Sequence, residues 1–232
     1  MPKPTPHITP PKTPLACSLC DTPQPVFLGA DQRRSYYQCP QCALVMVPPS
    51  QYLSLAAERR HYNCHCNSPD DPNYRQFLST LFLPLNQLLP PASRGLDFGC
   101  GPGPTLHLMF EEAGHRMAVY DPYYFPDNSL LAQTWDFITL SEVSEHLHAP
   151  GEVLQRVWRQ LNPGGMLGIM TRFFPANTPI ETWFYKNDDT HVCFFSTTTF
   201  EYLAKRLNAQ LQLEQNVAIL KKNAAPNKRD IP

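Results

Sequence analysis

The chain has 232 residues, of which 42% are hydrophobic, and its formal net charge at pH 7 is -1. This length accommodates one α/β domain of ordinary size and a small additional module. The near-neutral charge excludes a globally basic nucleic-acid-binding protein but leaves room for a local basic patch. We expect a soluble, cytoplasmic protein, because the sequence shows neither an export signal at its start nor an apolar run of about 18 residues.

Prolines are concentrated at the start of the chain: six of the 26 fall in the first fourteen residues, which have no apolar periodicity. We expect residues 1–14 to form a disordered or polyproline-like tail. The last segment, AAPNKRDIP at 224–232, is expected to fray as well.

Four of the eight cysteines form two C-x2-C pairs with eighteen residues between the pairs: Cys17, Cys20, Cys39 and Cys42. Each pair places two thiolates on one tight turn, and two such turns complete a tetrahedral four-sulfur zinc site. Apolar and aromatic residues on both sides of Gly29-Ala30-Asp31 predict a hairpin between the pairs, and ALVMVPP predicts a short strand after them. The pattern predicts a zinc ribbon over residues 15–50 with a structural Zn2+; incidental cysteines or two disulfides are the alternative.

Cys64 and Cys66 flank His65 and resemble a second metal cluster. A C-x-C pair has no second pair at a suitable distance here, so we interpret this spacing as coincidental.

Residues 51–91 are expected to be a helical linker or lid. The apolar positions of its second helix recur three and four residues apart, and Asp71-Pro72 is a typical helix start: Tyr74, Phe77, Leu78, Leu81 and Phe82. Tyr62, His65 and Asn67 lie on the link between the two helices. They are candidates for lining a pocket, with packing or surface roles as the alternative.

The sequence from Arg94 to Pro104 contains the most informative motif. Leu96-Asp97-Phe98 is typical of the end of a buried strand, and apolar spacing after Pro104 predicts a helix. Between them stands G-x-G-x-G at Gly99, Gly101 and Gly103. Glycines permit positive φ and let a ligand lie against bare backbone at the carboxyl edge of a sheet. The order strand, glycine loop, helix is the context that a nucleotide-binding motif requires.

The D-x-G-x-G-x-G form resembles motif I of class I methyltransferases, which bind S-adenosylmethionine (SAM), and the resemblance covers residues 92–223. It implies an α/β fold with a doubly wound, mostly parallel sheet and a C-terminal antiparallel hairpin. It also implies SAM contacts from the loop, from the end of the second strand and from the end of the fourth: Asp97, Gly99, Cys100, Gly101, Gly103, Asp121, Pro122, Ser141 and Glu142. Asp121 follows the strand HRMAVY, where a carboxylate can accept both ribose hydroxyls; an acid that only opens the Asp-Pro turn is the alternative.

The later segments follow the same order. A fourth strand starts at Asp136, a helix ends at Asn-Pro-Gly-Gly, GMLGIMTRFF is a fifth strand, and a Ser/Thr-capped helix precedes the final hairpin. Only fourteen residues separate Asp121 from Asp136, which is too short for a helix and a full third strand. The third strand is expected to be minimal or missing, and Tyr123, Tyr124 and Phe125 could supply aromatic walls for the adenine instead.

Glu142-x-x-Glu145-His146, together with the distant His191, forms the candidate catalytic set. Two carboxylates and an imidazole on one turn, with a second imidazole from elsewhere, could hold Mg2+ or another divalent ion. Small-RNA 2′-O-methyltransferases and ubiquinone-pathway O-methyltransferases look similar here. A generic motif that packs near SAM without metal, or His191 as a general base, is the alternative.

We therefore expect a SAM-dependent methyltransferase acting on an oxygen or nitrogen atom of a small molecule, enclosed by residues 51–90 and 174–192. Tyr62, His65, Trp183 and Tyr185 are the candidate substrate contacts. The alternatives are an RNA methyltransferase that uses the ribbon, for which Lys12, Arg33 and Arg34 offer few charges, and a non-catalytic SAM-binding protein. The acceptor and the oligomeric state are not predicted.

Overall fold

The computed structural model describes residues 15–64 and 67–224. The predictions for the N-terminal tail, for most of the C-terminal tail, for His65 and for Cys66 fall on residues outside this part of the chain. Within the described residues, no helix is long and apolar enough to cross a membrane.

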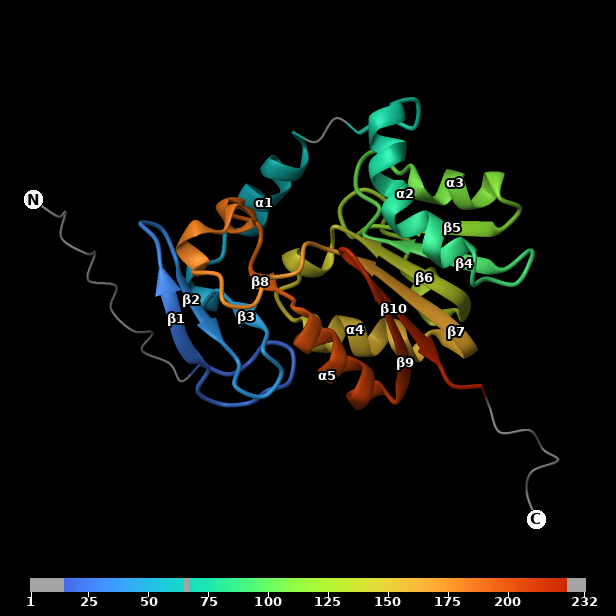
Figure 1. Ribbon diagram of the computed structural model, residues 1–232. Helices are drawn as coiled ribbons and strands as arrows, with labels where there is room; N and C mark the ends of the chain where they lie inside the picture. Colours follow the sequence, from blue (N-terminus) through green and yellow to red (C-terminus); the bar gives the residue numbers. More distant parts are fainter. Residues whose placement is uncertain (1–14, 65–66, 225–232) are drawn as a thin grey trace, which may run out of the picture.

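The larger of two sheets has six strands in the order β5-β4-β6-β7-β10-β9 (Figure 1). The first four are parallel, and the last two form an antiparallel hairpin. In sheet order, the strands are β5 (Arg116–Tyr120), β4 (Arg94–Phe98), β6 (Trp135–Ser141), β7 (Leu161–Met170), β10 (Val217–Lys222) and β9 (Ala209–Glu214). The predicted fold class is confirmed.

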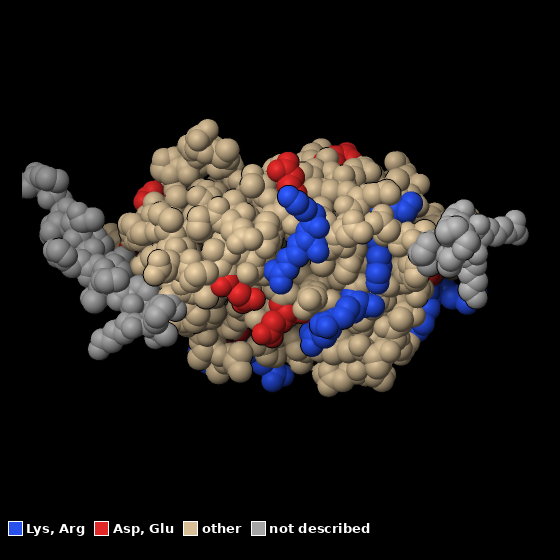
Figure 2. Space-filling model, turned by 90° about the horizontal axis from the view of Figure 1, so that it is seen from below, with Lys and Arg blue, Asp and Glu red and all other residues tan. Residues whose placement is uncertain are grey.

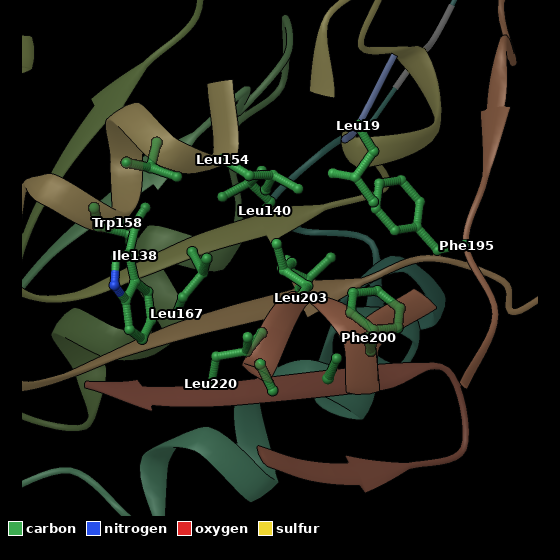
Figure 3. Close-up of a cluster of buried hydrophobic side chains, with 14 of the residues drawn as sticks. Leu19, Ile138, Leu140, Leu154, Trp158, Leu167, Phe195, Phe200, Leu203 and Leu220 are labelled. Atoms are coloured by element: carbon green, nitrogen blue, oxygen red, sulfur yellow. The ribbon is translucent and has the colours of Figure 1, made fainter. Parts of the chain in front are cut away.

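Helices cover both faces of this sheet, as in a doubly wound fold (Figure 1). On one face, α2 (Pro72–Asn86) packs against β7 and β10, and α3 (Leu106–Glu112) packs against β4 and β5. On the other face lie α4 (Pro150–Arg159) and α5 (Thr197–Leu207). Figure 3 shows Leu154 and Trp158 of α4 and Phe200 and Leu203 of α5 converging on this side of the sheet.

The segment between β5 and β6 contains no strand. A short 3-10 helix, η2 (Asn128–Ala132), lies there instead, and β5 is the edge strand of the sheet. The spacing of fourteen residues between Asp121 and Asp136 therefore predicted correctly that the third strand would be minimal or missing.

The cysteine-rich segment forms a second, antiparallel sheet in the order β1-β2-β3-β8. Three strands come from the predicted ribbon: β1 (Val26–Ala30), β2 (Ser35–Gln38) and β3 (Val45–Met46). The fourth, β8 (Cys193–Phe194), comes from far along the chain, beyond β7. The ribbon is therefore not confined to residues 15–50, and its core includes Phe174, Ile180, Trp183, Tyr185 and Phe194.

Short helices connect the two sheets. The chain leaves the ribbon through η1 (Pro49–Gln51) and α1 (Leu55–Tyr62), and it returns through η4 (Ile180–Thr182) and η5 (Phe184–Asn187). The turn after β6 contains η3 (Ser144–His146). The predicted helix starts at Asp71 and Ser196 are confirmed, since both residues cap their helices, α2 and α5, through their side chains. Ser54 caps α1 in the same way.

Arg34 links residues 186–191, which lead into β8, to the ribbon through hydrogen bonds. Its side chain is almost fully buried and donates hydrogen bonds to carbonyl oxygens of Lys186, Asp188 (2.9 Å), Asp189 (3.1 Å) and His191 (2.8 Å). Hydrogen bonds from a charged donor are stronger than neutral ones. The position of His191 therefore depends on the ribbon.

Ser196 provides a direct test of helix capping in α5. Its hydroxyl accepts from the Thr199 N–H while the Thr199 hydroxyl accepts from the Ser196 N–H, which is a reciprocal capping box. We expect Ser196→Ala to lower the free energy of unfolding by about 1 kcal/mol, measured by urea denaturation. Thr198→Ala, at an exposed position in the same first turn, is the control and should change stability by less than about 0.5 kcal/mol; equal losses would show that the cap contributes nothing.

Candidate active site

A cavity of about 720 Å³ opens at the carboxyl ends of β4, β5 and β6. Open α/β sheets bind ligands at this edge. The floor is formed by the turns that follow the three strands, and the cover by α1 and the start of α2. Both predicted lid residues that the structure describes, Tyr62 and Asn67, lie in its wall.

The glycine loop supplies bare backbone to the cavity. Gly99 and Gly101 have φ of 78° and 66°, a region that side chains rarely adopt. The Gly99 N–H donates to the Tyr120 carbonyl oxygen at 2.7 Å, which joins the loop to the end of β5. A Cβ on Gly101 would meet no atom within 4 Å, so this position faces open space.

Gly103 has a different role from the other two glycines. A Cβ there would lie 2.2 Å from the carbonyl oxygen of Asn67. Gly103 is outside the lining of the cavity, and it permits the close approach of the segment before α2. The cofactor contact expected at Gly103 stays a prediction.

Asp97 also lies behind the cavity wall rather than in it. Its side chain points into the sheet, where Oδ1 accepts a hydrogen bond from the Thr139 hydroxyl at 2.8 Å. Burial raises the pKa of Asp97 to about 6, against the lowering effect of Thr139. This hydrogen bond fixes the end of β4 below the loop, and the contact between Asp97 and SAM stays a prediction.

The raised pKa of Asp97 predicts how the free energy of unfolding changes with pH. The folded chain holds a proton on Asp97 up to pH of about 6, whereas the unfolded chain releases it near pH 4, so the wild type loses stability as the pH rises between these values. Two pKa units correspond to about 3 kcal/mol. We expect Asp97→Asn, which keeps an acceptor for Thr139, to be about 3 kcal/mol more stable than the wild type at pH 7.5 and equal to it at pH 4, by urea denaturation. A difference that does not change with pH would contradict the burial of a charged group here.

Asp121 organises the second wall of the cavity. It is buried, and its Oδ2 accepts from the Gly101 N–H at 3.1 Å while Oδ1 accepts from the N–H groups of Tyr123 (2.8 Å) and Tyr124 (3.1 Å). Pro122 and both tyrosines line the cavity. Phe125, the third predicted aromatic wall, instead pairs through its backbone with Asp121 and lies outside the lining.

Helix α1 is held over the cavity by polar contacts that the sequence did not reveal. The buried Glu58 carboxylate contacts the His148 Nε2 at 2.6 Å, and the Tyr124 hydroxyl donates to the Asn63 side chain at 2.7 Å. His61 Nε2 lies 3.0 Å from the Asp188 carboxylate. Positions 55, 58 and 62 share one helix face, so Glu58 at an inward position was the available signal.

The candidate catalytic residues lie close together where the turn after β6 borders the cavity. Glu142, at the end of β6, has a φ of 52°, a conformation that a non-glycine residue keeps only under constraint. The Tyr185 hydroxyl donates to Glu142 Oε2 at 3.0 Å and also contacts Glu145 Oε1. Burial and the neighbouring Glu145 raise the pKa of Glu142 to about 8.

His146 and His191 complete this group, with ring centres 4.7 Å apart. Both line the cavity with Ser141 and Glu142, while Glu145 is fully buried immediately behind. Burial and the neighbouring His146 lower the pKa of His191, which keeps the imidazole neutral near pH 7. The structure thus brings together all four residues that the sequence singled out.

The predicted substrate contacts at Trp183 and Tyr185 are not in the cavity wall. Trp183 packs in the ribbon core, with its ring 5.1 Å from that of Phe174 and 5.3 Å from that of Phe194. The hydroxyl of Tyr185 contacts the carboxylates of Glu142 and Glu145 from the side away from the cavity. Trp183 and Tyr185 belong to the ribbon core because the chain segment that carries them leads into β8, the fourth strand of the ribbon sheet.

The four ribbon cysteines converge on one point. The Sγ atoms of Cys17 and Cys42 are 3.5 Å apart, as are those of Cys20 and Cys39, and all four lie within 4.8 Å of one another. Such spacing fits a tetrahedral metal with four thiolate ligands.

Comparisons with known proteins agree with the fold. A family profile described as "Methyltransferase domain" matches residues 71–214. The Burkholderia thailandensis 1,6-didemethyltoxoflavin-N1-methyltransferase, solved with its substrate and S-adenosylhomocysteine, is 16% identical with a TM-score of 0.51, over 86% of this chain and 99% of that one. An O-methyltransferase family protein from the same organism is 12% identical with a TM-score of 0.47, over 73% of this chain.

This chain spans only 64% of the length of that O-methyltransferase family protein. No curated protein sequence matches the chain significantly. At these identities the structural likeness concerns the fold alone.

Proposed function

Since the chain belongs to the methyltransferase domain family, whose enzymes take their methyl group from SAM, we propose that it methylates an oxygen or nitrogen atom of a small molecule bound in the cavity at the end of β6. One observation carries this proposal: a single cavity joins the glycine loop to a buried set of carboxylate and imidazole groups. Its volume lies in the range of small-molecule sites, which extends from about 300 to 1,000 Å³.

The residues present fit SAM. The open space at Gly101 admits a ligand against the backbone, and the Asp121 carboxylate at the end of β5 suits ribose hydroxyls. Tyr123 and Tyr124 offer aromatic surface beside it. When bound, SAM supplies a methyl group on a sulfonium, which leaves without help from an acid.

The protein's own task is to place and deprotonate the acceptor. Positioning a nucleophile within about 3 Å of its target contributes much of the rate in such transfers. Neutral His191 can accept a proton from a hydroxyl or ammonium group, and Glu142 can receive a hydrogen bond from the acceptor. Tyr62, which stacks edge-on against His146 with ring centres 5.5 Å apart, covers this end of the cavity.

The structure gives no support to RNA as the acceptor. The ribbon arginines are already engaged: Arg34 is buried against carbonyl groups, and Arg33 forms a salt bridge of 2.6 Å with Asp189. On the face shown in Figure 2, basic side chains form short separated groups with acidic side chains among them rather than a continuous band. A phosphate backbone needs a basic surface.

We further propose that the four ribbon cysteines hold a structural Zn2+. The ribbon core alone is small, so the metal would contribute much of its stability. Because β8 and the segment before it pack into this core, the zinc would also stabilise the wall that carries Tyr185 and His191.

Calorimetric titration tests the cofactor part of the proposal. We expect one binding site per chain for SAM and for S-adenosylhomocysteine, and none for NADH. Methyl transfer from labelled SAM to a panel of phenols, hydroxy acids and amines then identifies the acceptor. Binding of NADH instead of SAM would contradict the proposal; SAM binding with no transfer to any small molecule would favour a non-catalytic SAM-binding protein.

A further inference from the structure

We propose that the acceptor carries a positively charged amine group, and that Glu58, Tyr62 and Tyr123 bind this group beneath α1. All three side chains line the same cavity as the candidate catalytic residues. The assignment rests on the proposed function, since it names the class of small molecule that the methyltransferase would modify. It makes Glu58 a residue that determines the specificity for the acceptor.

Glu58 is the buried residue of α1, with 4% of its surface exposed. The next two residues of the helix, Arg59 and Arg60, are exposed and lie outside the lining of the cavity. Helix α1 therefore turns a carboxylate toward the cavity and its arginines toward solvent. Burial of a carboxylate is unfavourable unless hydrogen bonds or an opposite charge compensate for it. A helix that only covers a cavity buries apolar side chains, so the carboxylate at the inward position points to a charged ligand.

Glu58 keeps hydrogen-bonding capacity for such a ligand. Its Oε1 lies 2.6 Å from His148 Nε2, and its Oε2 accepts from the Tyr123 hydroxyl at 3.5 Å, which is the outer limit of a hydrogen bond. A carboxylate offers about four lone-pair positions. Among the residues that the structure describes, no lysine or arginine forms a salt bridge with Glu58. An ammonium group can therefore replace the long contact with Tyr123 and form a charge-assisted hydrogen bond.

Two aromatic rings accompany the Glu58 carboxylate. Tyr62 lies one turn further along the same face of α1, and its ring centre is 5.9 Å from that of Tyr123. Burial and the nearby Glu58 carboxylate raise the pKa of Tyr62. The faces of tyrosine rings attract cations within about 6 Å, and cages of such rings recognise ammonium ligands. A buried carboxylate beside two tyrosine rings therefore suits an amine and disfavours a carboxylate or a phosphate.

The charge of the whole cavity agrees with this assignment. Among the residues that the structure describes, the lining contains one arginine, Arg156, and no lysine, against four carboxylic acids: Glu58, Asp121, Glu142 and Asp188. The Arg156 guanidinium lies over the Phe98 ring, 5.9 Å from its centre. A cleft lined mainly by acidic groups concentrates cations and repels anions.

Three phenols of similar shape and different charge test the assignment. Tyramine is a cation, 4-ethylphenol is neutral, and 4-hydroxyphenylacetate is an anion. Each is titrated calorimetrically at pH 7.5 into the full chain saturated with S-adenosylhomocysteine. We expect tyramine to bind more than about tenfold tighter than 4-ethylphenol, and the anion to bind more weakly than both. Glu58→Gln should reduce the advantage of tyramine over 4-ethylphenol to less than about threefold.

Glu152→Gln is the matched control. It removes the same charge from an exposed position in the first turn of α4, outside the lining of the cavity, so the preference for tyramine should remain. Equal affinity of the wild type for tyramine and 4-ethylphenol would overturn the assignment, and so would no binding of tyramine at about 10 mM. A Glu58→Gln variant that lost affinity for both phenols by the same factor would show only a structural role for Glu58 and would overturn it as well.

Cofactor affinity separates this assignment from the proposed function. Glu58→Gln should bind S-adenosylhomocysteine within about tenfold of the wild type. A greater loss would show that Glu58 serves the cofactor instead and would overturn the assignment. A wild-type chain that does not bind S-adenosylhomocysteine would remove the proposed function, whereas a chain that binds it without any preference for tyramine would remove only the assignment of the acceptor.

Discussion

Replacing Gly101 with valine is expected to reduce the affinity for SAM by more than about 100-fold while the chain stays folded. The reason is steric: the Cβ of residue 101 projects into open space at the wall where the cofactor is proposed to lie. The positive φ of 66° adds backbone strain of about 1–3 kcal/mol. The measurement is calorimetric titration with S-adenosylhomocysteine, which avoids turnover.

Gly114→Val separates these two effects. Gly114, in the turn between α3 and β5, has a φ of 90° and also meets open space, but it lies outside the cavity wall. The two variants should lose similar stability to urea, yet only the Gly101 variant should lose cofactor affinity. Wild-type affinity in Gly101→Val would show that the cofactor lies elsewhere.

Replacing Cys42 with serine is expected to remove the proposed ribbon zinc and to destabilise one wall of the candidate active site. Cys42 is fully buried among the four sulfur atoms. Loss of the metal should destabilise the ribbon core, which includes Trp183 and Tyr185. We expect backbone amides of residues 26–47 and 183–194 to exchange with deuterium more than about 100-fold faster, as measured by mass spectrometry of peptides.

The central sheet provides the internal reference for this experiment. Amides of β4 and β6 should keep their protection, and affinity for S-adenosylhomocysteine should fall less than about tenfold. Cys64→Ser, at an exposed cysteine outside the cluster, should retain one zinc per chain and the wild-type exchange pattern. Unchanged protection of residues 183–194 in Cys42→Ser would show that the proposed zinc does not stabilise this wall of the candidate active site.

The sequence was sufficient to predict elements whose signals are local. Strand β4, the glycine loop and α3 follow one another within a few residues, so strand, turn and helix signals are contiguous. The helix starts at Asp71 and Ser196 are equally local. The missing third strand was predictable because fourteen residues cannot contain a helix and a strand.

Long-range packing was not predictable in the same way. Strand β8 is two residues long and pairs with β3, about 150 residues earlier in the chain, so no local pattern marks it. For that reason Trp183 was expected in the acceptor site although it packs in the ribbon core. Asp97 shows the same limit: its motif predicts a place beside the cofactor, and only the sheet register reveals that its side chain faces Thr139.

The role of α1 also depends on tertiary contacts. Glu58 contacts His148, and Asn63 contacts Tyr124, across gaps of 90 and 61 residues. The helix therefore covers the cavity because several distant segments bind it, not because of its own amphipathic pattern.

A crystal structure with S-adenosylhomocysteine tests the central claim most directly. We expect the ligand's amino-acid end to lie against the backbone of residues 99–101, its ribose at Asp121, and its sulfur toward Glu142, His146 and His191. Density for the ligand at any other place, or a loop closed over the space beside Gly101, would contradict it.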